Sequence, residues 1–305
     1  MKNIIKVLKH KYGEYITEQL VTDDGRAILN GVEKQRKEEQ TEVMEHIKSL
    51  SDKNEEKLIP ENFLLNEKVE WGVDFSSWLG SLEIPKKYMF IGAEPHIVKG
   101  NNYQLVYEFG CYESKGDSVE KSIEKSAIQH YSRDDIWKYV TDIFVDDLTC
   151  ANIISFMSEC YVADLCYMVP KGCGQVKGIF QKLNEGLDEK SKLKKDDWIR
   201  FRNRVADTFL FDEIEAVNPE YIILHGNSAR KYFSNKIPDK KEYLIEGSSY
   251  KIWEGILEIE SKKYTVISIP HLKGIMKTML WKNKKNDYEK YKSAKKILRE
   301  IVKIN

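Results

Sequence analysis

Two side chains that can move protons each stand just after a short apolar run of the chain. Glu94 lies in the string Gly-Ala-Glu-Pro-His, and His271 lies in Ser-Ile-Pro-His. If both runs are strands of one parallel sheet, a carboxylate and an imidazole would meet at its edge and could share general acid–base work. Each residue alone is more often a cap, a surface charge or a structural histidine. The hypothesis therefore depends on the elements that position the pair.

Four apolar runs indicate the buried strands of such a sheet. They are YMFIG (88–92), VADLCYM (162–168), YIILHG (221–226) and YTVISIP (264–270). Apolar residues recur at helical spacing in residues 118–131, 134–144 and 196–217. This alternation predicts an α/β fold, a three-layer sandwich with a central, mainly parallel four-stranded sheet flanked by helices. The segment KIWEGILEIE (251–260) is expected to form a hairpin with the last strand.

Ligands of such sheets bind beyond the carboxyl ends of the strands. The residues that follow each apolar run are therefore the expected lining of a site. These segments are 93–96, 169–174, 227–230 and 271–276.

Residues 1–70 differ from the rest of the chain. They are rich in charge, and Val43, Ile47 and Leu50 follow helical spacing. We expect a helical extension there, without a chemical motif, and a single α/β domain over residues 71–305.

The share of hydrophobic residues is large enough for a hydrophobic core, and charged residues are unevenly distributed along the chain. Of the 305 residues, 41% are hydrophobic and 32% are charged, yet the formal net charge is zero, so the chain as a whole is not an evident polyanion binder. Residues 271–305 hold eleven Lys and Arg against three Asp and Glu, a local charge of +8. This basic end could meet phosphates, or it could be a solvated helix face.

Several features predict a cytoplasmic protein without a cofactor. The sequence has no run of 18 apolar residues, the length expected of a membrane-spanning helix. The apolar stretch among its first residues is too short for a signal peptide. The cysteines are odd in number and form no C-x-x-C, so we expect reduced, structural thiols and no metal site. They are Cys111, Cys150, Cys160, Cys166 and Cys173.

Four segments resemble, in the same order, motifs of the uracil-DNA glycosylase superfamily. IGAEPHIVKGNNYQLVYEF (91–109) is similar to its G-Q-D-P-Y-H motif and the aromatic that follows. YIILHGNSARKY (221–232) resembles its L-W-G-x-x-A-x-K element, with His225 in place of Trp. VISIPHLKG (266–274) resembles the strand before its H-P-S loop, and VADLCYMVP (162–170) the strand that carries its base-reading asparagine. The resemblance covers roughly residues 85–280.

The resemblance implies roles in flipping a pyrimidine out of DNA and cutting its bond to the sugar. Glu94 would activate water and stabilise the sugar cation, and His271 would donate to O2 of the departing base. Tyr107 would stack on the flipped base, which Asp164 would read. Ala93 and His96 would line the same pocket.

DNA contacts follow from the same resemblance. A helix start at Asn227 and Ser228 would offer backbone N–H groups to a phosphate. The residues after His271 would wedge into the duplex or hold phosphates. These residues are Leu272, Lys273, Ile275, Met276 and Lys277.

The departures from the family pattern are informative. Glu94 replaces an aspartate, and His271 is followed by Leu-Lys where the family has Pro-Ser. Loss of Pro-Ser favours an alternative in which the chain is a catalytically inactive DNA binder. The cysteines that precede the first motif in the iron–sulfur branch have no counterpart, so no cluster is expected.

Asp164 bears on which base is removed. An ionised Asp accepts from the N4 amino group of cytosine but cannot donate to O4 of uracil. His96, in place of the wall tyrosine, would leave room for a C5 substituent. We therefore hypothesise excision of a 5-modified cytosine, such as glucosylated hydroxymethylcytosine in phage DNA, which would leave an abasic site and serve antiviral defence.

Other interpretations remain open at this stage. One is ordinary uracil excision in base excision repair. Another is a metal-dependent nuclease or nucleotide hydrolase, which the lack of paired carboxylates beyond Glu94 and Asp164 disfavours. We expect a monomer that binds DNA and no membrane.

Overall fold

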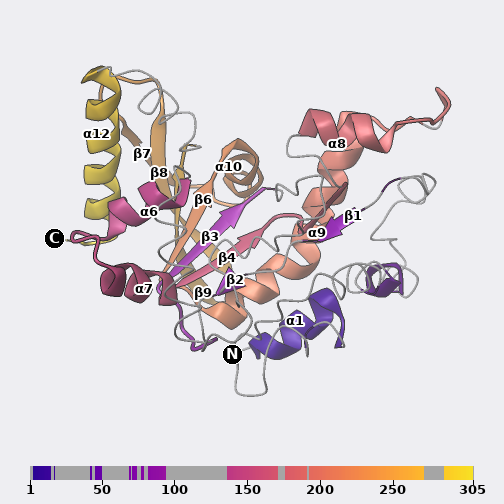
Figure 1. Ribbon diagram of the computed structural model, residues 1–305, viewed down its shortest axis with the longest axis horizontal. Helices are drawn as coiled ribbons and strands as arrows, with labels where there is room; N and C mark the ends of the chain where they lie inside the picture. Colours follow the sequence, from indigo (N-terminus) through magenta and orange to yellow (C-terminus); the bar gives the residue numbers. More distant parts are fainter. Residues whose placement is uncertain are drawn as a thin grey trace.

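The computed structural model describes a sheet and helices that pack against it. The described residues are 3–14, 17, 42, 45–49, 69, 71–73, 77–78, 82–93, 136–170, 176–190, 192–270 and 285–304. Within them the fold is α/β, with helices on both faces of a twisted mixed sheet (Figure 1).

Among the described residues the main sheet has seven strands, in the order β2-β4-β3-β6-β9-β8-β7. Their bounds in that order are Ser77–Trp78, Cys160–Asp164, Tyr88–Gly92, Tyr221–His225, Lys262–Ile269, Lys251–Ile259 and Lys240–Leu244. The central strands β4, β3, β6 and β9 are parallel, whereas β2, β8 and β7 are antiparallel to their neighbours.

The prediction of a four-stranded, mainly parallel sheet is therefore wrong in strand number, although its four runs supply the parallel centre. β7 was not foreseen because an exposed edge strand such as KKEYL has no apolar run. The hairpin of β8 with β9 is confirmed.

The predicted strand 162–168 is two strands rather than one. β4 ends at Asp164, and β5 (Met168–Pro170) leaves the main sheet to pair with β1 (Trp71–Val73). The chain bends at Leu165 and Cys166, whose N–H groups donate to the carbonyl oxygens of Gly92 and Ala93, each at 3.2 Å. All residues of the bend are buried, so the run of apolar residues continues through it. The sequence therefore gives no sign that the strand ends there.

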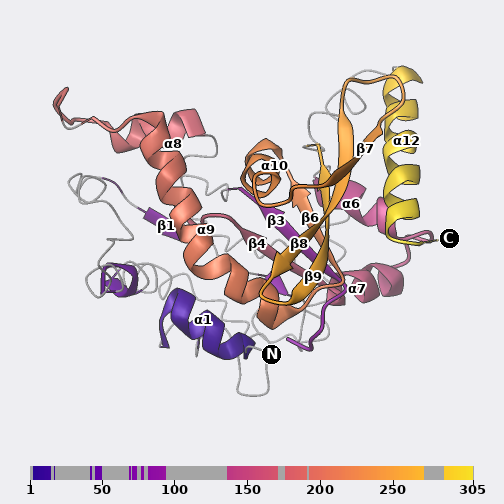
Figure 2. The same ribbon diagram turned by 180° about the vertical axis from the view of Figure 1, so that it is seen from behind.

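Two clusters of buried apolar side chains within the described residues cover the two faces of the sheet. One lies beneath α1 (Ile4–Tyr12), α8 (Val176–Leu183), α9 (Lys195–Val217) and α10 (Asn227–Ser234). The other lies beneath α6 (Ile136–Phe144), α7 (Cys150–Ser158) and α12 (Lys285–Ile301). Figure 2 shows the same separation from behind. The predicted helices 134–144 and 196–217 correspond to α6 and α9, while 118–131 lies outside the described residues.

The first helix, α1, packs directly on α9. Lys11 Nζ lies 2.7 Å from Glu213 Oε2 with both side chains buried, and Tyr161 donates to the other oxygen of Glu213 at 2.6 Å. The hydroxyl of Tyr167 donates to the carbonyl oxygen of Lys11 at 2.8 Å. α1 thus shares its core with α9 and β4. Of the residues that predicted a helical extension, Ile47 is buried in the same cluster, and Val43 and Leu50 lie outside the described residues.

Part of the basic carboxyl-terminal segment is engaged inside the fold. Lys295 Nζ on α12 lies 3.2 Å from Asp142 Oδ2 of α6, and Arg299 lies 2.5 Å from Asp146 just after α6. Tyr291 also donates to Asp142. These charges hold α12 against α6, whereas Lys292 and Lys296 of the same helix are exposed. The interpretations of the segment as a phosphate-binding or a solvated face therefore both stay predictions.

Candidate active site

The carboxyl ends of three adjacent parallel strands bring two polar side chains together over a glycine. Gly92 ends β3 and pairs with Asp164, the last residue of β4. On the other side of β3, His225 ends β6. A Cβ added to Gly92 would clash with Asp164 Oδ1 and lie 3.1 Å from His225 Nε2. The absent side chain at Gly92 therefore leaves the space into which Asp164 and His225 converge.

These three residues lie on one face of the sheet because strand side chains alternate in direction. The residues two positions before them belong to the cluster beneath α6 and α7. They are Phe90, Val162 and Ile223. The polar pair therefore lies one side-chain position beyond this part of the apolar cluster, and both Asp164 and His225 remain partly accessible.

The backbone holds the segments after β3 and β4 to each other. The N–H groups of Leu165 and Cys166 donate to Gly92 and Ala93, and the thiol of Cys166 contacts the carbonyl oxygen of Met168 at 3.2 Å. Ala93 is the residue before Glu94 in the chain. The start of the segment that carries Glu94 is therefore fixed beside the end of the strand that carries Asp164.

α10 begins at the same edge. Gly226 precedes it with φ of 93°, a conformation that favours glycine, and accepts the bond from Arg230 N–H at 3.1 Å. Asn227 is exposed and Ser228 half-exposed in the first turn. The first N–H groups of a helix have no partner within it, which is the basis for the expected phosphate contact.

The described residues bring together part of the set expected from the sequence. Ala93, Asp164, Asn227 and Ser228 all lie at the carboxyl edge of the parallel strands. The other expected site residues lie outside the described residues: Glu94, His96, Tyr107, His271, Leu272, Lys273, Ile275, Met276 and Lys277.

Chain connectivity relates Glu94 and His271 to this edge. Glu94 is two residues beyond Gly92. His271 is two residues beyond Ile269, which ends β9 and pairs with His225.

His225 was missed as a site residue. In the sequence, His225 stood out only as the residue in place of a tryptophan of the family that the chain resembles. Its position in the sequence could have indicated a site residue. His225 is the last residue of an apolar run and directly precedes a glycine that opens a helix. Its partnership with Asp164 depends on the order of β4, β3 and β6, which the sequence does not state.

Among the described residues, no group of three or more His, Cys, Asp or Glu side chains is arranged to hold a metal ion. The described cysteines, Cys150, Cys160 and Cys166, are free thiols. Burial raises the pKa of the Cys160 thiol well above its usual value, so this thiol stays protonated.

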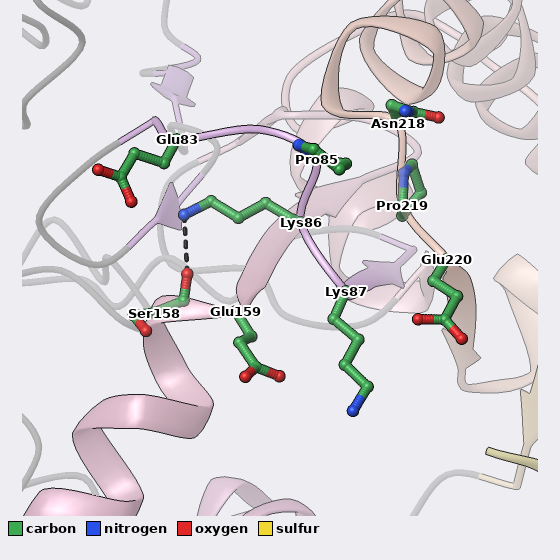
Figure 3. A pocket seen from close by; sticks show the side chains of 9 residues that line it. All are labelled: Glu83, Pro85, Lys86, Lys87, Ser158, Glu159, Asn218, Pro219 and Glu220. Carbon is green, nitrogen blue, oxygen red and sulfur yellow. Dashed lines mark hydrogen bonds between the residues drawn. The ribbon is translucent and has the colours of Figure 1, made fainter. Parts of the chain in front are cut away.

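A separate cavity of about 610 Å³ lies at the opposite, amino-terminal edge of the parallel strands (Figure 3). Lys86 points across it and donates to the carbonyl oxygen of Ser158 at 2.8 Å, at the last residue of α7. Burial lowers the pKa of Lys86. A lysine at the end of a helix satisfies a carbonyl that the helix leaves unpaired, so we assign Lys86 a structural role.

No helix in the described part of the chain combines the length and the apolar character needed to cross a membrane. The sequence matches no model of a known protein family, and no curated protein matches it at a significant level.

Proposed function

We propose that this protein is a DNA glycosylase that flips a pyrimidine out of DNA and hydrolyses its N-glycosidic bond, leaving an abasic site. The observation that supports this most is the convergence of Asp164 and His225 over Gly92 at the carboxyl edge of the parallel strands. A flipped base is read by hydrogen bonds to its Watson–Crick edge. A partly accessible carboxylate with an imidazole close by suits a flat, polar ligand of this kind.

The proposed reaction needs groups on both sides of the scissile bond. Cleavage leaves positive charge on the sugar and negative charge on the departing base. Glu94 stabilises the sugar cation and orients the attacking water, and His271 donates to O2 of the leaving base. The support for both is their chain position, two residues beyond the ends of β3 and β9.

The proposed base is a 5-modified cytosine, such as glucosylated hydroxymethylcytosine in phage DNA, which would make the protein a defence against phage. Asp164 accepts from the cytosine N4 amino group, an interaction that uracil cannot provide. The nearness of His225 supports a positioning role, because an imidazole N–H can orient a neighbouring carboxylate and keep its outer oxygen directed at the base.

A base-release assay tests the proposal. Four oligonucleotides that differ at one position would be compared: uracil, cytosine, hydroxymethylcytosine and glucosylated hydroxymethylcytosine. We expect abasic product with a modified cytosine. Release from uracil alone would instead indicate uracil repair. Binding of DNA without abasic product from any substrate would reject the enzyme and favour a silent binder.

A further inference from the structure

The turn end of the β7–β8 hairpin exposes two large apolar side chains. Leu244, the last residue of β7, is 62% exposed, and Tyr250, just before β8, is 47% exposed. Among the described residues β7 is the outermost strand on this side, and Figure 2 shows the hairpin at the margin of the sheet. Single exposed apolar residues are common on protein surfaces, so the meaning of these two depends on their place in the fold and on the groups around them.

The strand register places the hairpin end at the same edge of the sheet as the candidate active site. One row of paired residues crosses β6, β9, β8 and β7 at Leu224, Ser268, Trp253 and Glu242. β7 runs in the same direction as β6, because β8 is antiparallel to both β7 and β9. His225 lies one residue beyond this row and Leu244 two residues beyond it. Three strand spacings, roughly 14 Å, separate the two residues, a distance that about four nucleotides of a DNA strand span.

Hydrogen bonds hold the hairpin end in one shape. The N–H of Ile245 donates to the carbonyl oxygen of Tyr250 at 3.1 Å, and the N–H of Tyr250 donates to Ser248 Oγ at 3.1 Å. The N–H of Glu246 donates to Ser293 Oγ of α12 at 3.0 Å, and the side chain of Ile245 is fully buried. The exposed side chains therefore stand on a fixed support, which reduces the ordering that binding of a partner would cost.

Positive charge predominates beside Leu244, around Glu242. A side-chain hydrogen bond from Lys251 lowers the pKa of Glu242, and the nearby charges of Arg230 and Lys240 lower it further. These three cations and one carboxylate leave a local charge of +2. Arg230, in the first turns of α10, donates from Nη1 to the carbonyl oxygen of Lys251 at 3.0 Å. This bond holds the guanidinium beside the hairpin without neutralising its charge.

We propose that the turn end of this hairpin binds the DNA strand next to the flipped base, with Tyr250 and Leu244 packing on bases or sugars and Arg230 contacting a phosphate. The inference rests on the proposed function, since it takes DNA as the partner, and it adds a second contact surface beside the base site. Exposed aromatic side chains next to cations are the combination that binds single-stranded DNA, because bases stack on the rings and the cations meet the backbone. The position at the same edge as Asp164 and His225 favours DNA over a protein partner.

The first test measures the apolar contacts with a short fluorescent single-stranded oligonucleotide. We expect Leu244→Ala and Tyr250→Ala to weaken binding, the latter by about fivefold or more, whereas Tyr250→Phe keeps the ring and the affinity. The matched control is Ile256→Ala. Ile256 is 48% exposed on β8 but lies at the amino-terminal edge, where its partner Thr265 pairs with the first residue of β6.

The second test measures the contribution of the cation from the salt dependence of the same binding. Arg230→Gln should reduce the slope of log K against log salt by about one, and Arg230→Lys should keep it. Lys303→Gln is the matched control, because Lys303 is an exposed lysine beside a cavity that Tyr221 lines at the amino-terminal edge. An unchanged slope in Arg230→Gln would contradict the phosphate contact.

Equal affinity of the wild type, Tyr250→Ala and Leu244→Ala would overturn the hairpin contact, and so would an equal loss in Ile256→Ala. Base release together with unchanged binding by the hairpin variants would reject this inference alone. DNA binding that depends on the hairpin, without abasic product from any substrate, would reject the glycosylase alone. A wild type that does not bind DNA would reject both.

Discussion

At the scale of single residues, the lack of a side chain at Gly92 makes room for Asp164 and His225 in the candidate site. A methyl group at this position would clash with Asp164 Oδ1 and approach His225 Nε2 at 3.1 Å. We expect Gly92→Ala to lower the free energy of unfolding by about 1–3 kcal/mol, as overpacking does, and to lower base release further by moving both side chains. Urea unfolding and the base-release assay measure the two effects. Wild-type values in both would mean that the pair does not depend on the missing side chain.

Glu94 carries the proposed chemical step. Glu94→Gln keeps the size of the side chain and removes its charge, so base release should fall by about 10²–10⁴-fold while DNA binding is retained. Glu83→Gln, an exposed glutamate at the opposite edge of the sheet, is the matched control. Single-turnover release and fluorescence anisotropy would report the two quantities. Full release from Glu94→Gln would remove Glu94 from its role.

Asp164 determines the proposed base preference. Asp164→Asn adds an amide donor that can reach O4 of uracil, so preference should move from modified cytosine toward uracil by about 1–3 kcal/mol of discrimination. The ratio of release rates on the two substrates measures this change, with Asp188→Asn in an exposed loop as the control. An unchanged ratio would show that another group reads the base.

At the scale of elements, a charged contact holds α12 against the rest of the molecule. Arg299 lowers the pKa of Asp146 below its ordinary value of 3.8, mainly through a side-chain hydrogen bond. A lowered folded-state pKa stabilises the fold above the ordinary value, and this contribution is lost as pH falls through the folded value.

Asp146→Asn should therefore give a small drop in Tm at pH 7, because the carboxylate is exposed and screened. The difference from wild type should shrink as pH falls below about 4 and disappear below the lowered folded-state pKa, where the native carboxylate is also protonated. Thermal melts of both proteins at neutral and acidic pH would show this. A difference that is constant with pH would point to lost packing instead of lost charge.

Strong local patterns predicted the elements with apolar runs. The expected range of β3 matches the strand, β6 differs by one residue, and the hairpin of β8 with β9 formed as expected. The break between β4 and β5 could not be foreseen because it depends on hydrogen bonds from Leu165 and Cys166 to a strand more than 70 residues earlier. In the site, Asp164 was predicted from a motif, whereas His225 becomes relevant only once strand order is known.

At the scale of the whole molecule, one buried ion pair connects the amino-terminal helix to the centre of the fold. Lys11 and Glu213 are 2% and 0% exposed, and they are 202 residues apart in the chain. Lys11→Met removes the cation beside a buried carboxylate and should lower the free energy of unfolding by about 3–5 kcal/mol.

Urea unfolding of Lys11→Met, Glu213→Gln and the double variant would give the coupling between the two residues. The double variant should recover part of the loss because it also removes the buried charge. Lys192→Met, in an exposed pair with Glu189, is the control and should change stability by less than about 0.5 kcal/mol. Equal losses at the buried and exposed pairs would contradict this account.

The two hydrogen bonds from Leu165 and Cys166 to Gly92 and Ala93 make neighbouring parts of the candidate site mechanically dependent on each other. A displacement of the chain just before Glu94 would pull on the bend that follows Asp164. Substitutions that slow cleavage of the N-glycosidic bond should then also alter the selectivity for the base. Directed evolution of the cleavage rate without a change in base selectivity would first have to weaken these two hydrogen bonds.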